Sequence, residues 1–306
     1  MANIASLMPQ VRLGEHSISR LIVGGNPFSG NSHLSPEADD EMRRFYSGRR
    51  ILETLRRCEK WGINTVQARA DNHIMRLLVD YWESGGRLQW VAQTASERAD
   101  VRANIRQAAR LRPIGIYHHG SKTDEYWAQG RIDEVRDALL FIRDQGILAG
   151  LGTHAPEVIA YAEERGWEVD FYMACFYNLT RKPRPSAIAS GQFQEEEYNP
   201  ADPRAMCRII RQVNKPVLAF KILAASRLAR NREALRAAFA FAFANIKPQD
   251  AVVVGVFTKY CDQVMEDALL AMELGQACSY TAQPFASWPQ FVASPAGSGL
   301  EPRTST

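Results

Sequence analysis

The sequence lacks a long apolar run, a paired cysteine motif and a concentration of charge of one sign. None of its apolar stretches approaches the roughly 20 residues that a membrane-spanning helix needs, so no membrane span is expected. The first residues, MANIASLMPQVRLGEHS, lack the basic stretch followed by an apolar stretch that marks a secretory signal. We therefore expect a cytoplasmic protein.

The cysteines and the charges exclude further classes of protein. The five cysteines are widely spaced and none forms a CxxC pair, so neither a disulfide framework nor a zinc knuckle is expected. The net charge is only +3, and the arginines are scattered along amphipathic segments such as GRRILETLRRCEKWG instead of forming a basic tract. The composition predicts a small-molecule substrate as the partner, no nucleic acid and no membrane, and it points to no particular oligomeric state.

The chain does contain eight apolar segments of strand length, each followed by a segment of helix length. A short alternating pair, QVRLG and HSISR, precedes them and predicts a β-hairpin. Amphipathic helices are expected, for example, at 48–62, 131–146, 156–166 and 259–275. The strands are expected at 21–25, 64–68, 88–93, 113–117, 147–152, 169–174, 216–221 and 251–256.

Regular alternation of apolar strands and helices predicts a parallel sheet that is buried on both faces. Eight such units predict an α/β fold, a closed (β/α)8 TIM barrel with an N-terminal β-hairpin, as one domain over residues 1–280. The alternative is an open doubly wound sheet, but VGGNPFSG only weakly matches the Gly-rich turn that such a sheet carries. The tail at 281–306 is expected to be disordered or to cover one end of the barrel.

The active site of a barrel lies at the carboxyl ends of its strands, so polar residues that follow the strands are the candidates. Two long loops, at 26–47 and 178–200, follow the first and sixth strands and predict binding surfaces. Within the second loop, QFQEEEYNP is most simply a solvated acidic segment. The less favoured alternatives are that this loop covers the site as a lid or that one of its glutamates is a ligand. Candidate substrate-binding residues at strand ends are Asn26, Arg69, Asn72, His154 and Asn178.

Histidines are concentrated in these predicted loops. Of the six, five follow strands: His33, His73, His118, His119 and His154. Histidine is the common general acid or base and a common metal ligand. The pattern predicts that at least two of these side chains converge, although each alone is more typical of a surface or structural residue.

The second strand is followed by Arg69, Asp71, Asn72 and His73. Asp71 is a candidate acid or base together with the histidines, and it is an equally good N-cap for the next helix. Arg69 is harder to explain as a cap, and its planar guanidinium suits an anionic or polyol substrate.

Lys221 is the last candidate catalytic residue. It ends KPVLAFK and lies two and four residues after Ala219 and Val217. Side chains at such spacings point to the same face of a strand, so Lys221 is expected to point into the barrel mouth with them. A lysine among apolar side chains suits proton transfer or imine formation. The favoured alternative is a structural ion pair with a carboxylate such as Asp170 or Asp71.

Three segments resemble the aldo/keto reductase superfamily. VRLGEHSISRLIVGGNPFSG resembles its opening hairpin and first strand, and residues 131–179 resemble the middle of its barrel. Residues 234–271 resemble its last strand and helix, and the similarity covers most of residues 10 to 275. The resemblance implies the same barrel that the strand pattern predicts.

The family's chemistry uses Asp, Tyr, Lys and His, with Tyr protonating a carbonyl as nicotinamide delivers hydride, and the first three are not retained here. The Asp position matches Gln67, the Tyr position falls at Asn72 or His73, and the Lys position offers Gln93 or Thr94. Only the His is retained, as His119 or His118. The chain therefore resembles a divergent member whose catalytic corner carries different groups.

The cofactor-binding positions also differ from the family's pattern. The residues that would hold the nicotinamide are replaced by Thr153, His154 and Met173, whereas Thr258 and Lys259 partly match the loop that meets the adenosine phosphate. The resemblance therefore implies weakened NADP binding. Imidazole and carboxylate ligands would suit a divalent metal, but no spaced motif selects one.

These features predict a barrel enzyme of aldo/keto reductase ancestry that acts on a small sugar- or carbonyl-type substrate. The preferred chemistry is redox-neutral, acid/base or metal-assisted, as in a lyase, isomerase or hydrolase. One alternative is an NADP(H)-dependent reductase in which His73 replaces the Tyr as proton donor. The other is a non-catalytic binding subunit.

Overall fold

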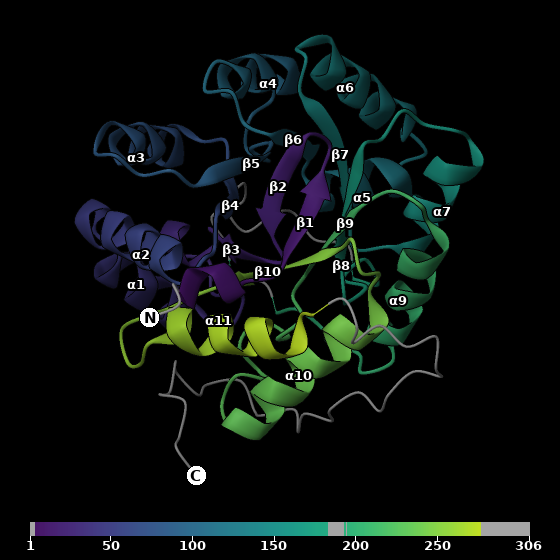
Figure 1. Ribbon diagram of the computed structural model, residues 1–306. Coiled ribbons are helices and arrows are strands. Elements are labelled where there is room, and N and C mark those ends of the chain that lie inside the picture. Colours follow the sequence, from purple (N-terminus) through teal and green to yellow (C-terminus); the bar gives the residue numbers. More distant parts are fainter. Residues whose placement is uncertain (1–3, 183–192, 194, 277–306) are drawn as a thin grey trace.

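The chain folds as the predicted TIM barrel in a computed structural model that describes residues 4–182, 193 and 195–276 (Figure 1). The parallel strands close in the order β10-β3-β4-β5-β6-β7-β8-β9. Each predicted strand is confirmed to within two residues at either end. The barrel strands are β3 (Leu21–Gly24), β4 (Thr65–Arg69), β5 (Gln89–Gln93), β6 (Gly115–His118), β7 (Leu148–Thr153), β8 (Phe171–Cys175), β9 (Val217–Phe220) and β10 (Ala251–Gly255).

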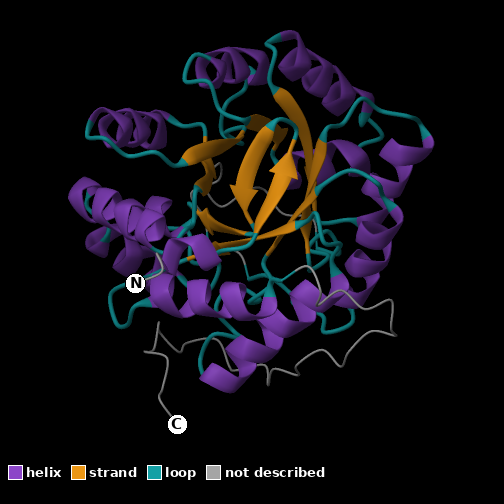
Figure 2. Ribbon diagram, viewed as in Figure 1, coloured by secondary structure: helices purple, strands orange, loops and turns teal. Residues whose placement is uncertain are grey.

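Helices surround the strands on the outside (Figure 2). The four predicted helices are confirmed as α2 (Gly48–Lys60), α6 (Asp133–Asp144), α7 (Pro156–Glu164) and α11 (Gln263–Leu274). None of the helices in the described part of the chain is long and apolar enough to cross a membrane. The other described helices are η1 (Ile4–Leu7), η2 (Pro27–Ser29), α1 (Pro36–Phe45), α3 (Asn72–Glu83), α4 (Val101–Ala109), α5 (Gly120–Ala128), α9 (Asp202–Gln212) and α10 (Arg232–Asn245).

Successive strand residues alternate between the helices and the barrel interior. On β4, Val66 and Ala68 belong to the larger core that the helices cover, whereas Gln67 and Arg69 line cavities at the barrel mouth. This two-residue period is a property of any strand, and burial on both faces explains why the strands are so apolar.

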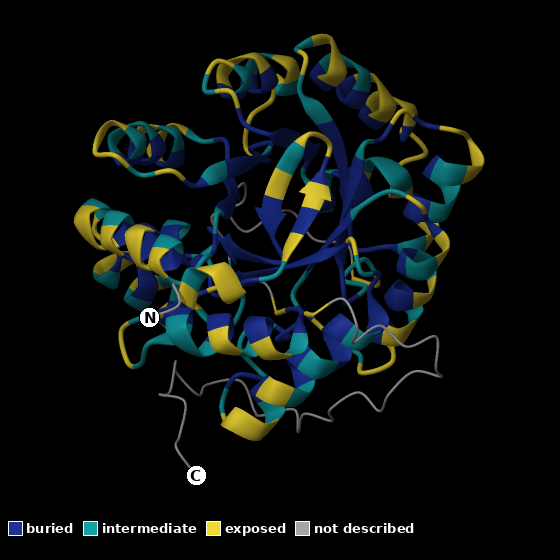
Figure 3. Ribbon diagram, in the orientation of Figure 1, coloured by how far each residue is buried: buried dark blue, intermediate teal, exposed yellow. Residues whose placement is uncertain are grey.

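The N-terminal hairpin covers the amino-terminal end of the barrel. Its strands β1 (Gln10–Leu13) and β2 (His16–Ser19) pair antiparallel, as predicted. Leu13 and Ile18 are buried with Val91 and Phe171 from the barrel interior. The alternate positions Gln10, Arg12 and Ser17, on the other face of the hairpin, are exposed (Figure 3). The mouth at the opposite end is therefore the end that is left for ligands.

Two expectations change in the structure. The segment at 26–47 is not a structureless loop, because it contains η2 and α1. Ser35 caps α1 by accepting a hydrogen bond from Ala38 N, and Pro36 occupies its first position, where a missing N–H costs nothing.

Lys221 lines the mouth cavity, as predicted, but strand parity is not what brings it there. Val217 and Ala219 face the helices, and Leu218 faces the interior, so parity alone would send Lys221 outward. The strand ends at Phe220, however, and Lys221 adopts a left-handed φ of 59° that breaks the alternation and brings its side chain to the mouth. The tail at 281–306 and most of 183–194 lie outside the described residues, and the single-domain boundary at 280 stays a prediction.

Gly150 offers a test of how the barrel interior is filled. A Cβ atom at this position would lie 2.3 Å from Cζ of Phe171 and 2.7 Å from Cβ of Tyr117. We expect Gly150→Ala to lower the free energy of unfolding by about 1–3 kcal/mol, the usual cost of overpacking, in urea denaturation. The double variant Gly150→Ala/Phe171→Leu should recover part of that loss, because leucine is smaller than phenylalanine and leaves room for the methyl group at position 150. Equal stability of Gly150→Ala and the natural sequence would show that Phe171 does not fill this space.

Candidate active site

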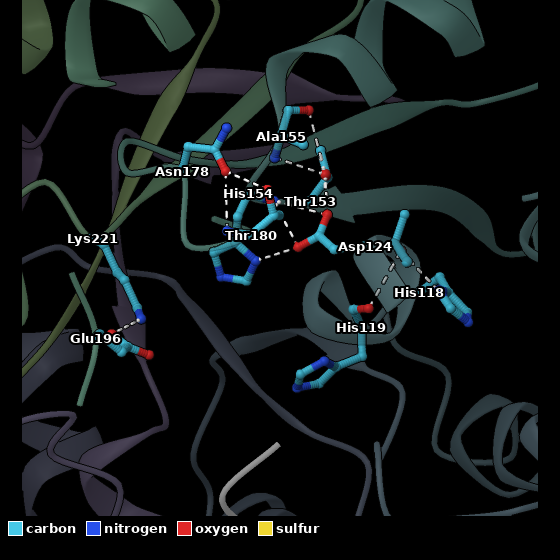
Figure 4. Close-up of polar contacts among 11 residues, drawn as sticks. His118, His119, Asp124, Thr153, His154, Ala155, Asn178, Thr180, Glu196 and Lys221 are labelled. Carbon is cyan, nitrogen blue, oxygen red and sulfur yellow. Dashed lines mark hydrogen bonds and ion pairs between the residues drawn. The ribbon is translucent and has the colours of Figure 1, made fainter. Parts of the chain in front are cut away.

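A cavity of about 610 Å³, partly open to solvent, lies at the carboxyl ends of the strands. Polar and titratable side chains from seven successive strand ends or following loops line it, and Figure 4 draws four of them, His119, His154, Glu196 and Lys221. The lining includes Asn26, His33, Arg69, Gln93, Tyr117, His119, His154, Glu196 and Lys221.

His154 and Asp124 form a hydrogen-bonded pair in the wall of this cavity. Nδ1 of His154 lies 2.6 Å from Oδ2 of Asp124, and both side chains are less than a tenth exposed. The carboxylate also accepts the backbone N–H of His154 at 3.2 Å and the Thr153 hydroxyl at 2.5 Å. Because Nδ1–H donates to the carboxylate, Nε2 is the nitrogen that remains for a substrate. Figure 4 shows the two residues coming from neighbouring segments, α5 and the end of β7.

Gly152 allows α5 to bring Asp124 this close to β7. A Cβ at Gly152 would lie 2.6 Å from the His118 carbonyl oxygen and 2.9 Å from the Tyr117 ring. Any larger residue would push the start of α5 outward, since the nearest neighbour is the backbone carbonyl of His118. The approach of α5 to β7 therefore depends on this glycine.

His119 lies across the cavity from the Lys221–Glu196 pair, with its ring directed away from that of His118 (Figure 4). Its Nδ1 is buried and makes no hydrogen bond to any described residue. Desolvation, together with the positive charge of Arg69 and the neighbouring His154, holds its pKa well below the usual value. His119 is therefore a neutral imidazole at neutral pH, and it lines the cavity.

Lys221 and Glu196 form the charged side of the cavity. Nζ of Lys221 lies 2.7 Å from Oε2 of Glu196, and Nδ1 of His33 lies 2.9 Å from Oε1. The Tyr198 hydroxyl donates to the same carboxylate, and the other nitrogen of His33 lies 3.1 Å from Nδ2 of Asn26. This network connects the ends of β3, β8 and β9 across the mouth.

Arg69 and Tyr117 complete the floor of the cavity. Nε of Arg69 lies 3.2 Å from Asp71, and its Nη2 contacts Glu97, so two carboxylates balance this buried charge. The Tyr117 hydroxyl accepts a hydrogen bond from Gln67 at 2.8 Å, and burial raises its pKa. Tyr117 is therefore a protonated phenol in the barrel centre.

Five of the predicted site residues line this cavity: Asn26, Arg69, His119, His154 and Lys221. Lys221 has a carboxylate partner, as the structural alternative supposed, but the partner is Glu196. Asp71 binds Arg69 instead, and Asp170 binds Arg143.

The other predicted residues lie elsewhere for identifiable reasons. Asp71 is the N-cap of α3, and His73, in the first turn of that helix, is exposed. Asn72 is also exposed and accepts a hydrogen bond from Arg98. The side chain of His118 points out of the barrel toward the helices, as that of Ile116 two residues before it does, and its Nδ1 lies 2.8 Å from the Thr123 hydroxyl. The side chain of Asn178 accepts both the N–H and the hydroxyl of Thr180 and shapes the turn after β8.

Two important residues, Asp124 and Tyr117, are absent from the sequence-based predictions, and Glu196 enters them only through the less favoured alternative that one glutamate of its segment has a ligand role. Asp124 lies on α5, whose buried residues are Gly120, Thr123 and Asp124, so this helix has no apolar stripe to reveal it. The acidic segment at 195–197 is not fully solvated, since Glu196 is buried between exposed neighbours. The alternation of buried Glu196 and Tyr198 with exposed residues is the signal that could have found it.

The residues expected for a metal or a nucleotide do not gather in this way. Across residues 4–182, 193 and 195–276, no group of three His, Cys, Asp or Glu side chains is arranged to hold a metal ion. Lys259 contacts Glu41 at the surface, and the Thr258 N–H lies 3.3 Å from the Tyr46 hydroxyl. A phosphate at Lys259 would meet the Glu41 carboxylate, so these two residues do not fit the adenosine phosphate that the resemblance implies.

Comparisons with known proteins agree with the fold and do not select a reaction. No family model and no curated protein matches the sequence. The apo form of Gox0644 is 12% identical with a TM-score of 0.53, covering 98% of this chain and 99% of that one. The glycerol dehydrogenase AKR11B4 from Gluconobacter oxydans is 13% identical with a TM-score of 0.52, covering 96% and 100%.

A barrel with different chemistry is nearly as similar. The truncated 3-deoxy-D-arabino-heptulosonate 7-phosphate synthase from Thermotoga maritima is 11% identical with a TM-score of 0.50, covering 87% of this chain and 90% of that one. The resemblance to aldo/keto reductases is therefore confirmed as a distant structural match, alongside other TIM barrels. The class that these findings define is the TIM barrel.

The buried histidines predict a specific pH dependence of stability. Desolvation and the nearby Lys122 lower the pKa of His118 from 6.5 to about 4. Between these values the unfolded chain binds a proton that the folded chain does not, so the free energy of unfolding should fall as the pH drops from 6.5 to about 4. Urea denaturation across this range should show a shallower fall for His118→Asn, which keeps a donor for Thr123. The exposed His73→Asn is the control, and an identical pH profile for all three proteins would contradict the assignment.

Proposed function

We propose that this protein is an enzyme that moves a proton on a small carbonyl- or sugar-type substrate, without net oxidation or reduction. His154 is the base and Asp124 orients it. The observation that carries the proposal is the 2.6 Å contact between Nδ1 of His154 and Asp124 in the wall of the mouth cavity. A carboxylate on Nδ1 leaves Nε2 as an acceptor and stabilises the imidazolium that forms when it takes a proton.

The other cavity residues supply what a proton transfer next to a carbonyl needs. As Nε2 of His154 removes a proton from the carbon beside the carbonyl, negative charge develops on the carbonyl oxygen. Neutral His119 can donate a hydrogen bond to that oxygen without carrying a charge of its own. Return of the proton to the neighbouring carbon would complete an isomerisation, and loss of a leaving group from that carbon would complete an elimination.

The geometry gives less support to the two alternatives. The reductase hypothesis required His73 as proton donor, but His73 is exposed on α3 and does not line the cavity. A non-catalytic binding subunit has no use for an oriented base beside a neutral imidazole, since perturbed titratable groups in one cavity favour catalysis. Both alternatives also predict no exchange of substrate protons.

Solvent exchange at carbon tests the proposal directly. The protein, placed in D2O with small aldoses, ketoses and 2-keto acids in turn, should incorporate deuterium at the carbon next to one carbonyl, as followed by proton NMR. His154→Gln and Asp124→Asn should slow this exchange about 10²- to 10⁴-fold, the usual contribution of a general base.

The control for these variants is His73→Gln, because that histidine lies outside the cavity and its loss should leave the exchange rate unchanged. Absence of exchange for every compound, or an undiminished rate in His154→Gln, would refute the assignment of His154 as base.

A further inference from the structure

We propose that Lys221 forms an imine with the carbonyl group of the substrate, so that the protein works on free aldehydes or ketones through a covalent intermediate. This inference rests on the proposed function in its choice of substrate class. It goes further by assigning a nucleophile to the same cavity.

The position of Lys221 differs from that of a structural lysine in the same chain. Lys247 is equally buried, and its Nζ contacts both Asp250, at 2.9 Å, and the Ile210 carbonyl, at 2.8 Å, so it is enclosed by protein. Within the described part of the chain, the one hydrogen bond of Lys221 Nζ is with Glu196, and the lysine lines the cavity. The ammonium group also lies 5.7 Å from the centre of the Tyr198 ring, on the same side of the cavity as Glu196.

The backbone holds Lys221 in an unusual conformation. Its φ of 59° is left-handed, and Ala224, Ala225 and Ser226 in the same turn also have positive φ. Left-handed conformations are unfavourable for a non-glycine residue and persist where the surrounding structure imposes them. Here the effect is to direct Nζ into the mouth, although the parity of β9 would direct the side chain to the helices.

Glu196 is placed to take a proton from the ammonium group. Its side chain is only 1% exposed, and it lies 2.7 Å from Nζ. His33 and the Tyr198 hydroxyl hold the same carboxylate in place. A lysine must lose its proton before it can attack, and a fixed carboxylate at this distance provides the acceptor.

The reaction balances without any oxidant or reductant. Nζ passes one proton to Glu196 and its lone pair forms a bond to the carbonyl carbon. The carbon–oxygen bond then breaks, and the oxygen leaves as water with the two protons that Nζ has lost, one of them returned by Glu196. The product is an iminium ion with one N–H. Because the ammonium and the iminium both carry one positive charge, Glu196 remains compensated throughout, and no buried charge is left unpaired.

An iminium would also make the proposed proton transfer easier. Its positive nitrogen draws electrons from the neighbouring carbon more strongly than a neutral carbonyl does, and this favours removal of the proton by His154. Both residues line the same cavity, and Phe220, next to Lys221 in the chain, packs its ring 5.5 Å from that of His154.

Reductive trapping tests the inference. The full chain is incubated with dihydroxyacetone, glyceraldehyde or pyruvate and then with sodium borohydride, which converts an imine to a stable amine. Intact mass and peptide mapping should find one adduct per chain, on Lys221. Lys221→Arg keeps a charge for Glu196 and should lose the adduct, whereas Lys259→Arg, at an exposed surface lysine, should keep it. Glu196→Gln should slow trapping about 10²-fold or more.

The outcomes separate this inference from the proposed function. Adducts spread over exposed lysines, adducts that persist in Lys221→Arg, or no adduct with any probe would overturn the imine. Proton exchange that continues in Lys221→Met without trapping would leave the proposed function intact and refute the nucleophile. Trapping on Lys221 without proton exchange would support Lys221 as the nucleophile and refute the proposed function. Circular dichroism and thermal unfolding check that each variant is folded.

Discussion

The two-residue period of the barrel strands is the constraint on which the rest of the structure depends. Every second residue faces the helices, where most side chains are apolar, and the alternate residues carry polar groups into the barrel. On β4 this places Gln67 and Arg69 inside, and on β6 it places Tyr117 inside and His118 outside. Closure of the barrel then collects every strand end at one mouth.

Residues just past the strand ends are released from this alternation, and the proposed chemistry depends on them. His119 begins the turn into α5, and Lys221 leaves β9 through a left-handed residue. Their side chains reach the cavity because the chain turns there. The mouth is therefore built from two sets of residues. In the inner layer, the alternation along the strands determines which side chains face the cavity, and in the upper layer the turns after the strands determine it.

Charge compensation fixes side chains in both layers. Lys221 is paired with Glu196, and Arg69 with Asp71 and Glu97, so each buried cation has a carboxylate at contact distance. Burying such a charge without a partner would cost several kcal/mol. The pairs fix the side chains in position before any ligand arrives, and this preorganisation is what acid/base catalysis requires.

The sequence predicts the scaffold far better than the site, for a physical reason. Apolar runs and their spacing are local properties, so the eight strands and the hairpin could be predicted closely. Even α1 had a local signal, the capping Ser35 followed by Pro36. The alternation of side chains along β6 could also have shown that His118 points away from the cavity and that His119 is the histidine in it, had the end of β6 been known exactly.

The partners of the site residues could not be predicted in the same way. Asp124 meets His154 across 30 positions of the chain, and Glu196 meets Lys221 across 25. These contacts depend on how loops fold over the mouth, and no spacing in the sequence encodes them. The left-handed residue at Lys221 is likewise a consequence of the turn after β9, where parity predicts the wrong direction.

A crystal structure of the protein soaked with dihydroxyacetone would test the central claim most directly. We expect density for the compound in the mouth cavity, with its carbon atoms between Nε2 of His154 and Nζ of Lys221, and an oxygen within hydrogen-bonding distance of His119. Density for the compound only at other surfaces, or side chains of these three residues that face separate regions of solvent, would contradict it.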